Sequence, residues 1–208
     1  GLSPVVEDFS TKMSNKNRHL IRIITCAVFK PAIEYLHLER GFPNLRLTYL
    51  PPDLHLLPRK LKDRMLTVIK AAQKSKERVI CLYGNCFPDI DDFCQEYGVT
   101  KVPGHYCYEM LLGSEKFDQL LNEMAGTYFA EKDLIENFEE YCVMPLELHD
   151  EDMKRYCFNQ YRRLLYVRQP SDPNLVIQAG EVASFLGLSL DVSDADYSYL
   201  EKSLIGLL

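Results

Sequence analysis

Five thiol and imidazole side chains follow apolar segments of the sequence, at the places where strands are expected to end. Cys26 follows RIIT and Cys86 follows LYGN, whereas His105 and Cys107 follow KVPG. His55 comes after LTYLPPDL. Thiolate sulfur and imidazole nitrogen are preferred donors for zinc and other soft metals, and three cysteines with one histidine form a common tetrahedral zinc shell. We therefore take these five residues as candidate metal ligands.

The elements that must position these side chains alternate between strand and helix patterns. Pro31 and Gly41 mark the two ends of one expected helix, and Pro58 opens another in which apolar residues recur at helical spacing. Such alternation favours parallel βαβ units with right-handed crossovers. We expect the strands at about 19–25, 45–50, 78–83, 99–104, 162–170 and 188–193.

The sequence thus predicts an α/β fold of three layers, in which helices flank a mostly parallel sheet. We expect a single domain over residues 18–208, with a helical insertion at about 106–160 that covers one end of the sheet. Residues 1–17 are mostly polar and are expected to form an N-terminal arm outside the core. A chain of 208 residues is long enough to bury a substantial core.

The carboxyl ends of parallel strands share one edge of the sheet, and ligands bind at this edge in open α/β folds. The candidate ligands would meet there, although no pair of them has the C-x-x-C spacing of a zinc ribbon. The alternative is that each cysteine is a packed thiol of the core. We expect this for Cys81 and Cys94, whereas Cys142 and Cys157, in the insertion, are either structural or close over the site.

Further residues near these positions could line a pocket or carry a proton. Glu109, two residues after Cys107, could orient a ligating histidine or act as an acid or base, and it is the one candidate for catalysis. An acid at this position would also simply favour the start of a helix. The turn-like segment AGTYF would bring two more side chains towards the same region. The candidates for binding a cofactor are Tyr83, Gly84, Tyr108, Thr127 and Tyr128.

The composition excludes several classes of function. A net charge of -6 argues against broad binding to nucleic acid or to anionic membranes. No apolar run approaches the roughly 20 residues that span a bilayer, and GLSPVVEDFSTKMSNKNRHL lacks the order of a secretory signal. We therefore expect a cytoplasmic protein whose seven cysteines stay reduced, bind metal or do redox chemistry. Neither G-x-G-x-x-G nor G-x-x-x-x-G-K-[ST] occurs, which argues against the usual dinucleotide and P-loop sites.

Short motifs also occur in a recognisable order along the chain. They are IITC (23–26), LH followed by proline (54–58), LYGNC (82–86), HYC (105–107), LLGSEKF (111–117) and AGTYF (125–129). This series resembles an uncharacterised domain-of-unknown-function family of methanogens and other anaerobes, often encoded beside corrinoid-dependent methyltransferases. The family's usual Asp-Cys pair stands here as Tyr106-Cys107. The resemblance implies a cytoplasmic α/β protein with a cysteine-rich site, and it implies no particular reaction.

A second similarity concerns the chemistry of the same segment. His105, Cys107 and the distant Cys142 are similar to the H-x-C…C zinc motif of methylcobalamin:thiol methyltransferases, in which zinc activates a thiol acceptor. Metal coordination keeps a thiol deprotonated at neutral pH, so that it can attack a methyl group. Those enzymes have a much longer chain, so the similarity is one of chemistry alone.

These observations lead to one main hypothesis and three alternatives. We expect a metal-binding protein, most simply zinc, of anaerobic one-carbon or corrinoid metabolism, whose partner is a small molecule or a corrinoid or methyltransferase protein. Three protein ligands with an open position would permit catalysis, whereas four would make the metal structural. The alternatives are an iron–sulfur cluster on the same thiols, a pocket for a corrinoid or another tetrapyrrole, and a non-catalytic accessory protein of a methyltransferase system.

Overall fold

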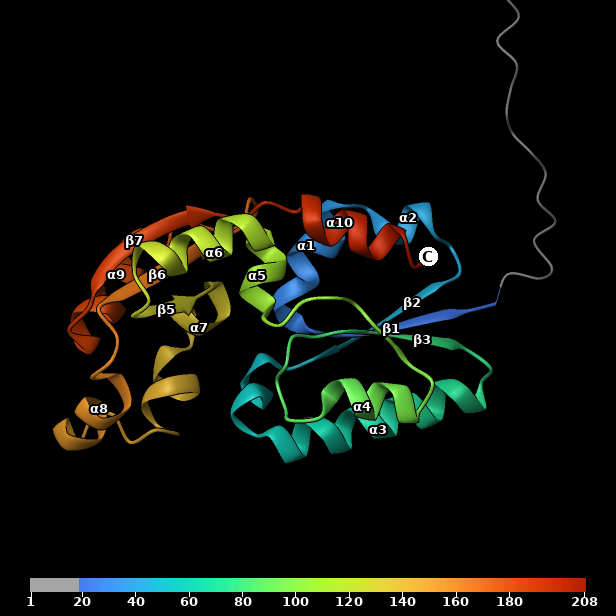
Figure 1. Cartoon of the computed structure of the whole chain (residues 1–208), viewed down its shortest axis with the longest axis horizontal. Helices are drawn as coiled ribbons and strands as arrows, with labels where there is room; N and C mark the ends of the chain where they lie inside the picture. The colour runs from blue at the N-terminus through green and yellow to red at the C-terminus, as the bar shows by residue number, and fades with distance from the viewer. Residues whose placement is uncertain (1–18) are drawn as a thin grey trace, which may run out of the picture.

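Two parallel β-sheets organise residues 19–208, the part of the chain that the computed structural model describes (Figure 1). The first sheet has the strand order β2-β1-β3-β4 and the second has the order β5-β6-β7. Every strand pairing in both sheets is parallel, which confirms the predicted α/β class. The expected arm at residues 1–17 lies outside the described residues. The strands are β1 (Ile21–Cys26), β2 (Leu45–Leu50), β3 (Arg78–Leu82), β4 (Thr100–Lys101), β5 (Thr127–Ala130), β6 (Arg163–Arg168) and β7 (Ser189–Asp194).

Helices connect the strands and cover the faces of both sheets. Short 3-10 turns at Ala27–Phe29 and Pro52–Leu56 follow β1 and β2, and a π-helical turn lies at Glu139–Val143. None of the helices in residues 19–208 is long and apolar enough to cross a membrane. The α-helices are α1 (Lys30–Tyr35), α2 (Leu38–Gly41), α3 (Pro58–Lys74), α4 (Ile90–Glu96), α5 (Cys107–Leu112), α6 (Ser114–Glu123), α7 (Lys132–Glu136), α8 (Glu151–Phe158), α9 (Val176–Leu186) and α10 (Ser198–Ile205).

Strand β1 lies at the centre of the first sheet and is apolar on both faces. Ile23 and Ile24 point to opposite faces and are both fully buried, since helices cover each face. Helix α3 begins at Pro58, as predicted, and its apolar stripe packs against the sheet. The buried residues of this stripe recur at the helical spacing that the sequence shows; they are Leu61, Met65, Ile69 and Ala72.

The strand order creates a crevice at one end of the first sheet. Strands β2 and β3 pair with opposite sides of β1, so right-handed crossovers carry α1 and α2 to one face and α3 to the other (Figure 1). Loops that leave neighbouring strands in opposite directions open a crevice beyond the carboxyl ends, where ligands bind in such folds. Cys26 ends β1, and the loop that carries Cys86 follows β3. Both thiols therefore lie at this crevice.

The second sheet differs from the single sheet that we expected. The segment predicted as a helical insertion, at about 106–160, contains strand β5 as well as α5 to α8, and the predicted AGTYF turn continues as that strand. A strand of four residues between two helices is too short to show a clear alternation in the sequence. Strand β5 pairs with β6, which the sequence did predict, so these elements form a separate sheet.

Hydrogen bonds and a shared core hold the two sheets together. The amide of Gln169, after β6, donates to the Val28 carbonyl at 3.3 Å and accepts from the Tyr197 hydroxyl at 2.7 Å. After β7 the chain returns to the first sheet, where α10 buries Leu200 and Leu204 in the same core as β1 and α3. Figure 1 shows α10 beside α1, and Tyr197, directly before α10, meets Tyr35 of α1 edge to face at 5.4 Å.

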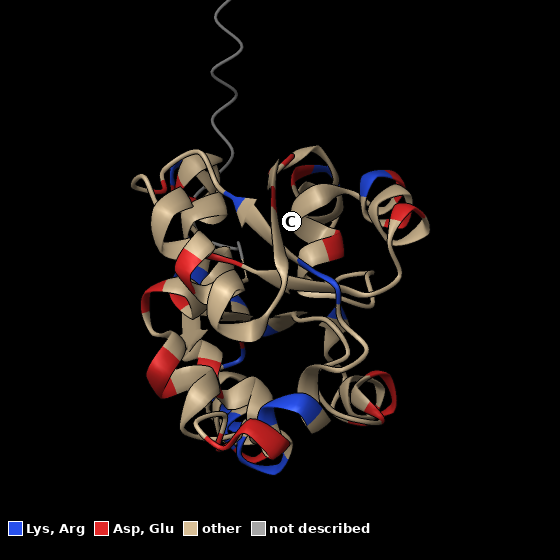
Figure 2. Cartoon of the chain, turned by 90° about the vertical axis from the view of Figure 1, so that its left-hand side faces the viewer, with Lys and Arg blue, Asp and Glu red and all other residues tan. Residues whose placement is uncertain are grey.

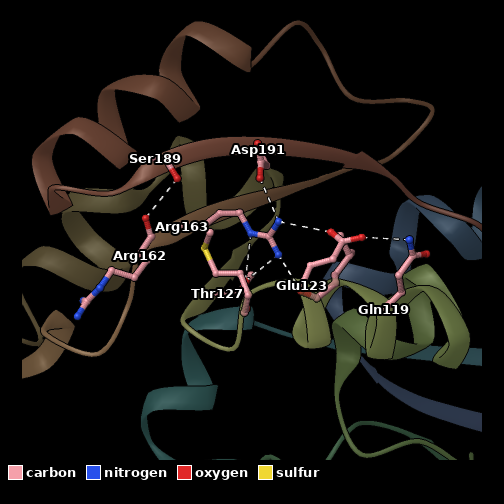
Figure 3. Close-up of polar contacts among 9 residues, drawn as sticks. Gln119, Glu123, Thr127, Arg162, Arg163, Ser189 and Asp191 are labelled. Carbon is pink, nitrogen blue, oxygen red and sulfur yellow. Dashed lines mark hydrogen bonds and ion pairs between the residues drawn. The ribbon is translucent and has the colours of Figure 1, made fainter.

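A buried arginine ties the second sheet to helix α6. Arg163, at the start of β6, is 5% exposed and donates to the Thr127 hydroxyl, to the Leu120 carbonyl and to Asp191 (Figure 3). Its guanidinium also lies 4.0 Å from Glu123 of α6. This one side chain therefore connects β5, β6, β7 and α6, and it fixes the position of β5 beside the first sheet.

Candidate functional site

A cavity of about 440 Å³ lies between the crevice of the first sheet and strand β5 of the second. Its walls include three of the seven cysteines, namely Cys26, Cys86 and Cys107. Both histidines predicted as ligands, His55 and His105, also line it. The structure thus brings all five predicted metal ligands to one cavity, although they come from four separate passages of the chain.

A close approach of two backbone segments places the second and third thiols side by side. Gly84, in the loop after β3, packs so tightly that a Cβ atom there would lie 2.8 Å from the His105 carbonyl oxygen and 3.0 Å from the Cys107 nitrogen. The neighbouring Asn85 N–H donates to the same carbonyl at 2.7 Å. Because residue 84 has no side chain, the loop that carries Cys86 can lie against the segment that begins α5.

The electrostatics of the three thiols single out Cys107 as the one most readily ionised. A hydrogen bond from the Cys86 thiol lowers the pKa of Cys107, and the Gly84 N–H lowers it further against the effect of burial. The same contact raises the pKa of Cys86. Burial, and then the charge of Cys107, raise the pKa of Cys26. Ionisation of Cys107 therefore makes ionisation of Cys86 and Cys26 less favourable.

The two histidines approach the cavity with one ring nitrogen already engaged. Nδ1 of His55 lies 2.7 Å from the Pro52 carbonyl, and Nδ1 of His105 lies 3.2 Å from the side-chain nitrogen of Asn85. A carbonyl can only accept, so Nδ1 of His55 carries the proton and Nε2 is its metal-binding nitrogen. Within residues 19–208, no three Cys, His, Asp or Glu side chains already stand in an arrangement that could hold a metal ion. Metal binding would thus require side-chain rotation.

The five residues predicted to bind a cofactor, Tyr83, Gly84, Tyr108, Thr127 and Tyr128, all line the cavity. Their polar groups differ in what they can offer. The Thr127 hydroxyl donates to the Met124 carbonyl at 2.6 Å and accepts from Arg163. Its donor is therefore already used within the protein. The Tyr128 hydroxyl lies 3.7 Å from the Cys142 sulfur. The Tyr83 hydroxyl is buried and has no hydrogen-bond partner within residues 19–208.

Other residues considered from the sequence lie outside the cavity walls. Glu109, the candidate for catalysis, accepts from the His105 backbone N–H and the Ser114 hydroxyl, so it holds the backbone of the loop and not the imidazole ring. Cys81 and Cys94 are buried in the first core, as expected, and the Cys94 thiol raises the pKa of Cys81. Cys142 is buried in the second core and Cys157 packs against it, so their placement fits the structural alternative.

Glu131 is a feature of the cavity that sequence reasoning missed. It follows β5, is 3% exposed and lines the cavity, and its two carboxylate oxygens accept from the Asp133 and Leu134 N–H groups at the start of α7. Burial raises the pKa of Glu131 to about 7, although these hydrogen bonds act in the opposite direction. The rule that identified the cysteines, a position directly after a predicted strand, could not identify Glu131, because β5 is too short to be predicted.

The raised pKa of Glu131 predicts a pH dependence of stability. Folding raises this pKa from 4.5 to about 7, so the folded state binds more protons than the unfolded state between these values. The free energy of unfolding should then fall by about 3 kcal/mol as the pH rises from 4.5 to beyond 7, through this group alone. Urea denaturation at pH 5 and pH 8 checks this, since Glu131→Gln should remove this component of the difference. An unchanged difference in the variant would contradict the prediction.

Charged residues are arranged differently on the outside of the molecule and in the cavity. Acidic and basic positions are interspersed along the outer helices (Figure 2). In the described part of the chain, Glu131 is the one acid among the residues that line the cavity, and no Lys or Arg lines it. The remaining walls are mostly aromatic and aliphatic. The cavity can therefore offer soft metal donors, aromatic faces and one carboxylate.

Comparison with known proteins supports the predicted resemblance to a domain-of-unknown-function family. No curated protein and no solved structure matches the chain. One family model matches residues 49–204, a segment that contains four of the five candidate metal ligands and Glu131, whereas Cys26 precedes it. The chain therefore belongs to the family described as "Protein of unknown function (DUF1638)".

Proposed function

We propose that the chain is a metal-binding protein, most simply a zinc protein, whose ion is held at the wall of the cavity by Cys26, Cys86 and Cys107. The observation that carries the proposal is the meeting of these thiols, from β1, from the loop after β3 and from the start of α5, at one cavity. A set of soft sulfur donors suits zinc, and His55 or His105 is the fourth protein ligand if the shell is closed.

The residues present fit such an ion in their chemistry. Thiols must lose their protons to bind a metal, and Cys107 already has a lowered pKa. A bound cation would remove the mutual repulsion that resists ionisation of Cys86 and Cys26. With three protein ligands, the ion would act as a Lewis acid or keep a bound thiol ionised.

The cavity beside the thiols is where a small molecule would be held. Its volume lies within the range of ligand pockets, and its walls are mostly aromatic and aliphatic. On this proposal the protein is cytoplasmic and serves anaerobic one-carbon or corrinoid metabolism, together with a corrinoid or methyltransferase protein. This wider role is supported by the resemblance of the motif series at residues 23–129 to the family of anaerobes described above.

Metal analysis of protein purified without oxygen tests the proposal. We expect one equivalent of bound metal per chain, retained in Cys157→Ser and lost in Cys86→Ser and Cys107→Ser. Cys157 is a matched control because it is half-buried but lies outside the cavity walls. Bound iron and sulfide, with a visible absorbance that bleaches in air, would show that the same thiols hold an iron–sulfur cluster instead of zinc. Wild-type protein free of any metal would overturn the proposal and favour a non-catalytic accessory role.

A further inference from the structure

We propose that the cavity takes a small organic cation, an amine or a quaternary ammonium compound. The inference rests on the proposed function in one respect, that this cavity is the substrate site. It adds the chemical class of the ligand, which neither the thiols nor the metal specify. Three independent features of the cavity carry it.

The first feature is the aromatic surface of the walls. Tyr108 and Phe129 stack with ring centroids 5.5 Å apart, and Tyr128 meets Tyr161 edge to face at 5.2 Å. Tyr83 and Tyr141 also line the cavity. The faces of such rings carry partial negative charge, and they attract ammonium groups most strongly where water is excluded.

The second feature is the sign of the charge that the cavity wall carries when Glu131 is ionised. Glu131 is buried in the cavity wall, and Lys and Arg are absent from the wall within residues 19–208. The charges of two further carboxylates, Asp133 and Asp172, repel that of Glu131 and also raise its pKa. A buried carboxylate without a cation is costly, and an anionic ligand would add to that cost. A cationic ligand would supply the missing countercharge.

The third feature is a polar group that lacks a partner. Tyr83 is 2% exposed, its hydroxyl makes no hydrogen bond within the described residues, and the side chain lines the same cavity. Buried hydroxyls normally have partners, because leaving one unpaired costs about 1–3 kcal/mol. The hydroxyl oxygen can accept from an ammonium N–H or from the hydroxyl of a ligand.

The capping role of Glu131 does not explain its burial. Asp150 caps α8 with the same pattern, accepting from the Asp152 and Met153 N–H groups, and it does so at the surface. A helix start therefore needs neither a glutamate nor a buried one. Glu131 lies close enough to the cavity tyrosines for its charge to act on Tyr108 and Tyr141. The carboxylate and these two tyrosines line the same cavity.

Calorimetric titration of the metal-loaded full chain tests the proposal with a pair of matched probes. Choline is the cation, and 3,3-dimethylbutan-1-ol is its neutral isostere. We expect choline to bind at least tenfold more tightly than the alcohol. Glu131→Gln should lower the affinity for choline at least tenfold and leave the affinity for the alcohol unchanged. Asp150→Asn should leave both affinities unchanged. Equal affinity for the two probes, or no binding of choline, would overturn the proposal.

A second variant separates the aromatic contribution from the fold. Tyr141 is partly exposed, so the Tyr141→Leu variant should fold. It should lower the affinity for choline severalfold, whereas Tyr141→Phe should leave that affinity unchanged. Circular dichroism of each variant shows whether it is folded. Unchanged choline affinity in a folded Tyr141→Leu and a folded Glu131→Gln would refute the assignment. Metal content is a separate measurement, so failure here is distinguishable from failure of the proposed metal site.

Discussion

Replacing Arg163 with methionine is expected to lower the free energy of unfolding by about 3 kcal/mol or more, because charge-assisted hydrogen bonds of this kind contribute about 1.5–3 kcal/mol each. Arg163 is 5% exposed and donates to Thr127, to the Leu120 carbonyl and to Asp191. Methionine fills much of the space of the stem but supplies no donor. The buried Leu120 carbonyl would lose this partner.

The neighbouring Arg162 provides the control for this change. Within residues 19–208 its side chain donates only to nearby carbonyls, those of Asn159 and Tyr161, and these bonds are exposed. Arg162→Met should therefore change the free energy of unfolding by about 0.5 kcal/mol at most. Urea denaturation of both variants measures the difference. Equal losses of stability in the two variants would show that the Arg163 network does not hold β5 in place.

Gly84→Ala should both destabilise the protein and disrupt the cavity. A Cβ atom at this position would lie 2.8 Å from the His105 carbonyl oxygen and 2.9 Å from the Tyr106 Cα, which are backbone atoms that cannot rotate away. We expect a loss of about 3 kcal/mol, as for other overpacked positions, and a displacement of Cys107 from Cys86. Metal binding should fall with the loss of this contact.

Gly41 offers a matched control for the added methyl group. It ends α2, and a Cβ atom there would have no neighbour within 4 Å. Gly41→Ala should leave stability unchanged or raise it by about 0.5 kcal/mol, because alanine restricts the unfolded chain. Thermal unfolding and metal content of the two variants provide the comparison. A stable Gly84→Ala variant with full metal content would mean that this close approach is not needed for the site.

The first sheet could be predicted because its signals are local and strong. The run VICLY (79–83) is apolar along its length, and Pro58 with the apolar stripe of α3 marks a helix without ambiguity. Since parallel strands end at one edge, the sequence alone predicts that Cys26 and Cys86 lie together. Their presence in one cavity follows from the order of β2, β1 and β3.

The second sheet and the carboxylate depend on contacts that the sequence does not display. Strand β5 has four residues, too few for a periodic pattern, and its place is set by the distant Arg163. In the sequence, Glu131 looks like an ordinary acid at the start of a helix. Its burial appears only when the two sheets are assembled. Thr127 is predicted from the sequence to bind a cofactor, and it does line the cavity. Its hydroxyl, however, is already hydrogen bonded to Arg163 and to the Met124 carbonyl, which the sequence does not display.

Anaerobic titration with Co²⁺ tests most directly whether the three thiols bind one ion. Cobalt takes the place of zinc in such sites, and each thiolate that binds it adds to a charge-transfer absorption in the near ultraviolet. We predict saturation at one equivalent, with intensity that falls in each single Cys→Ser variant of Cys26, Cys86 and Cys107 and stays unchanged in Cys157→Ser. A charge-transfer band that survives substitution of all three cysteines, or no such band in the wild-type protein, would contradict the account.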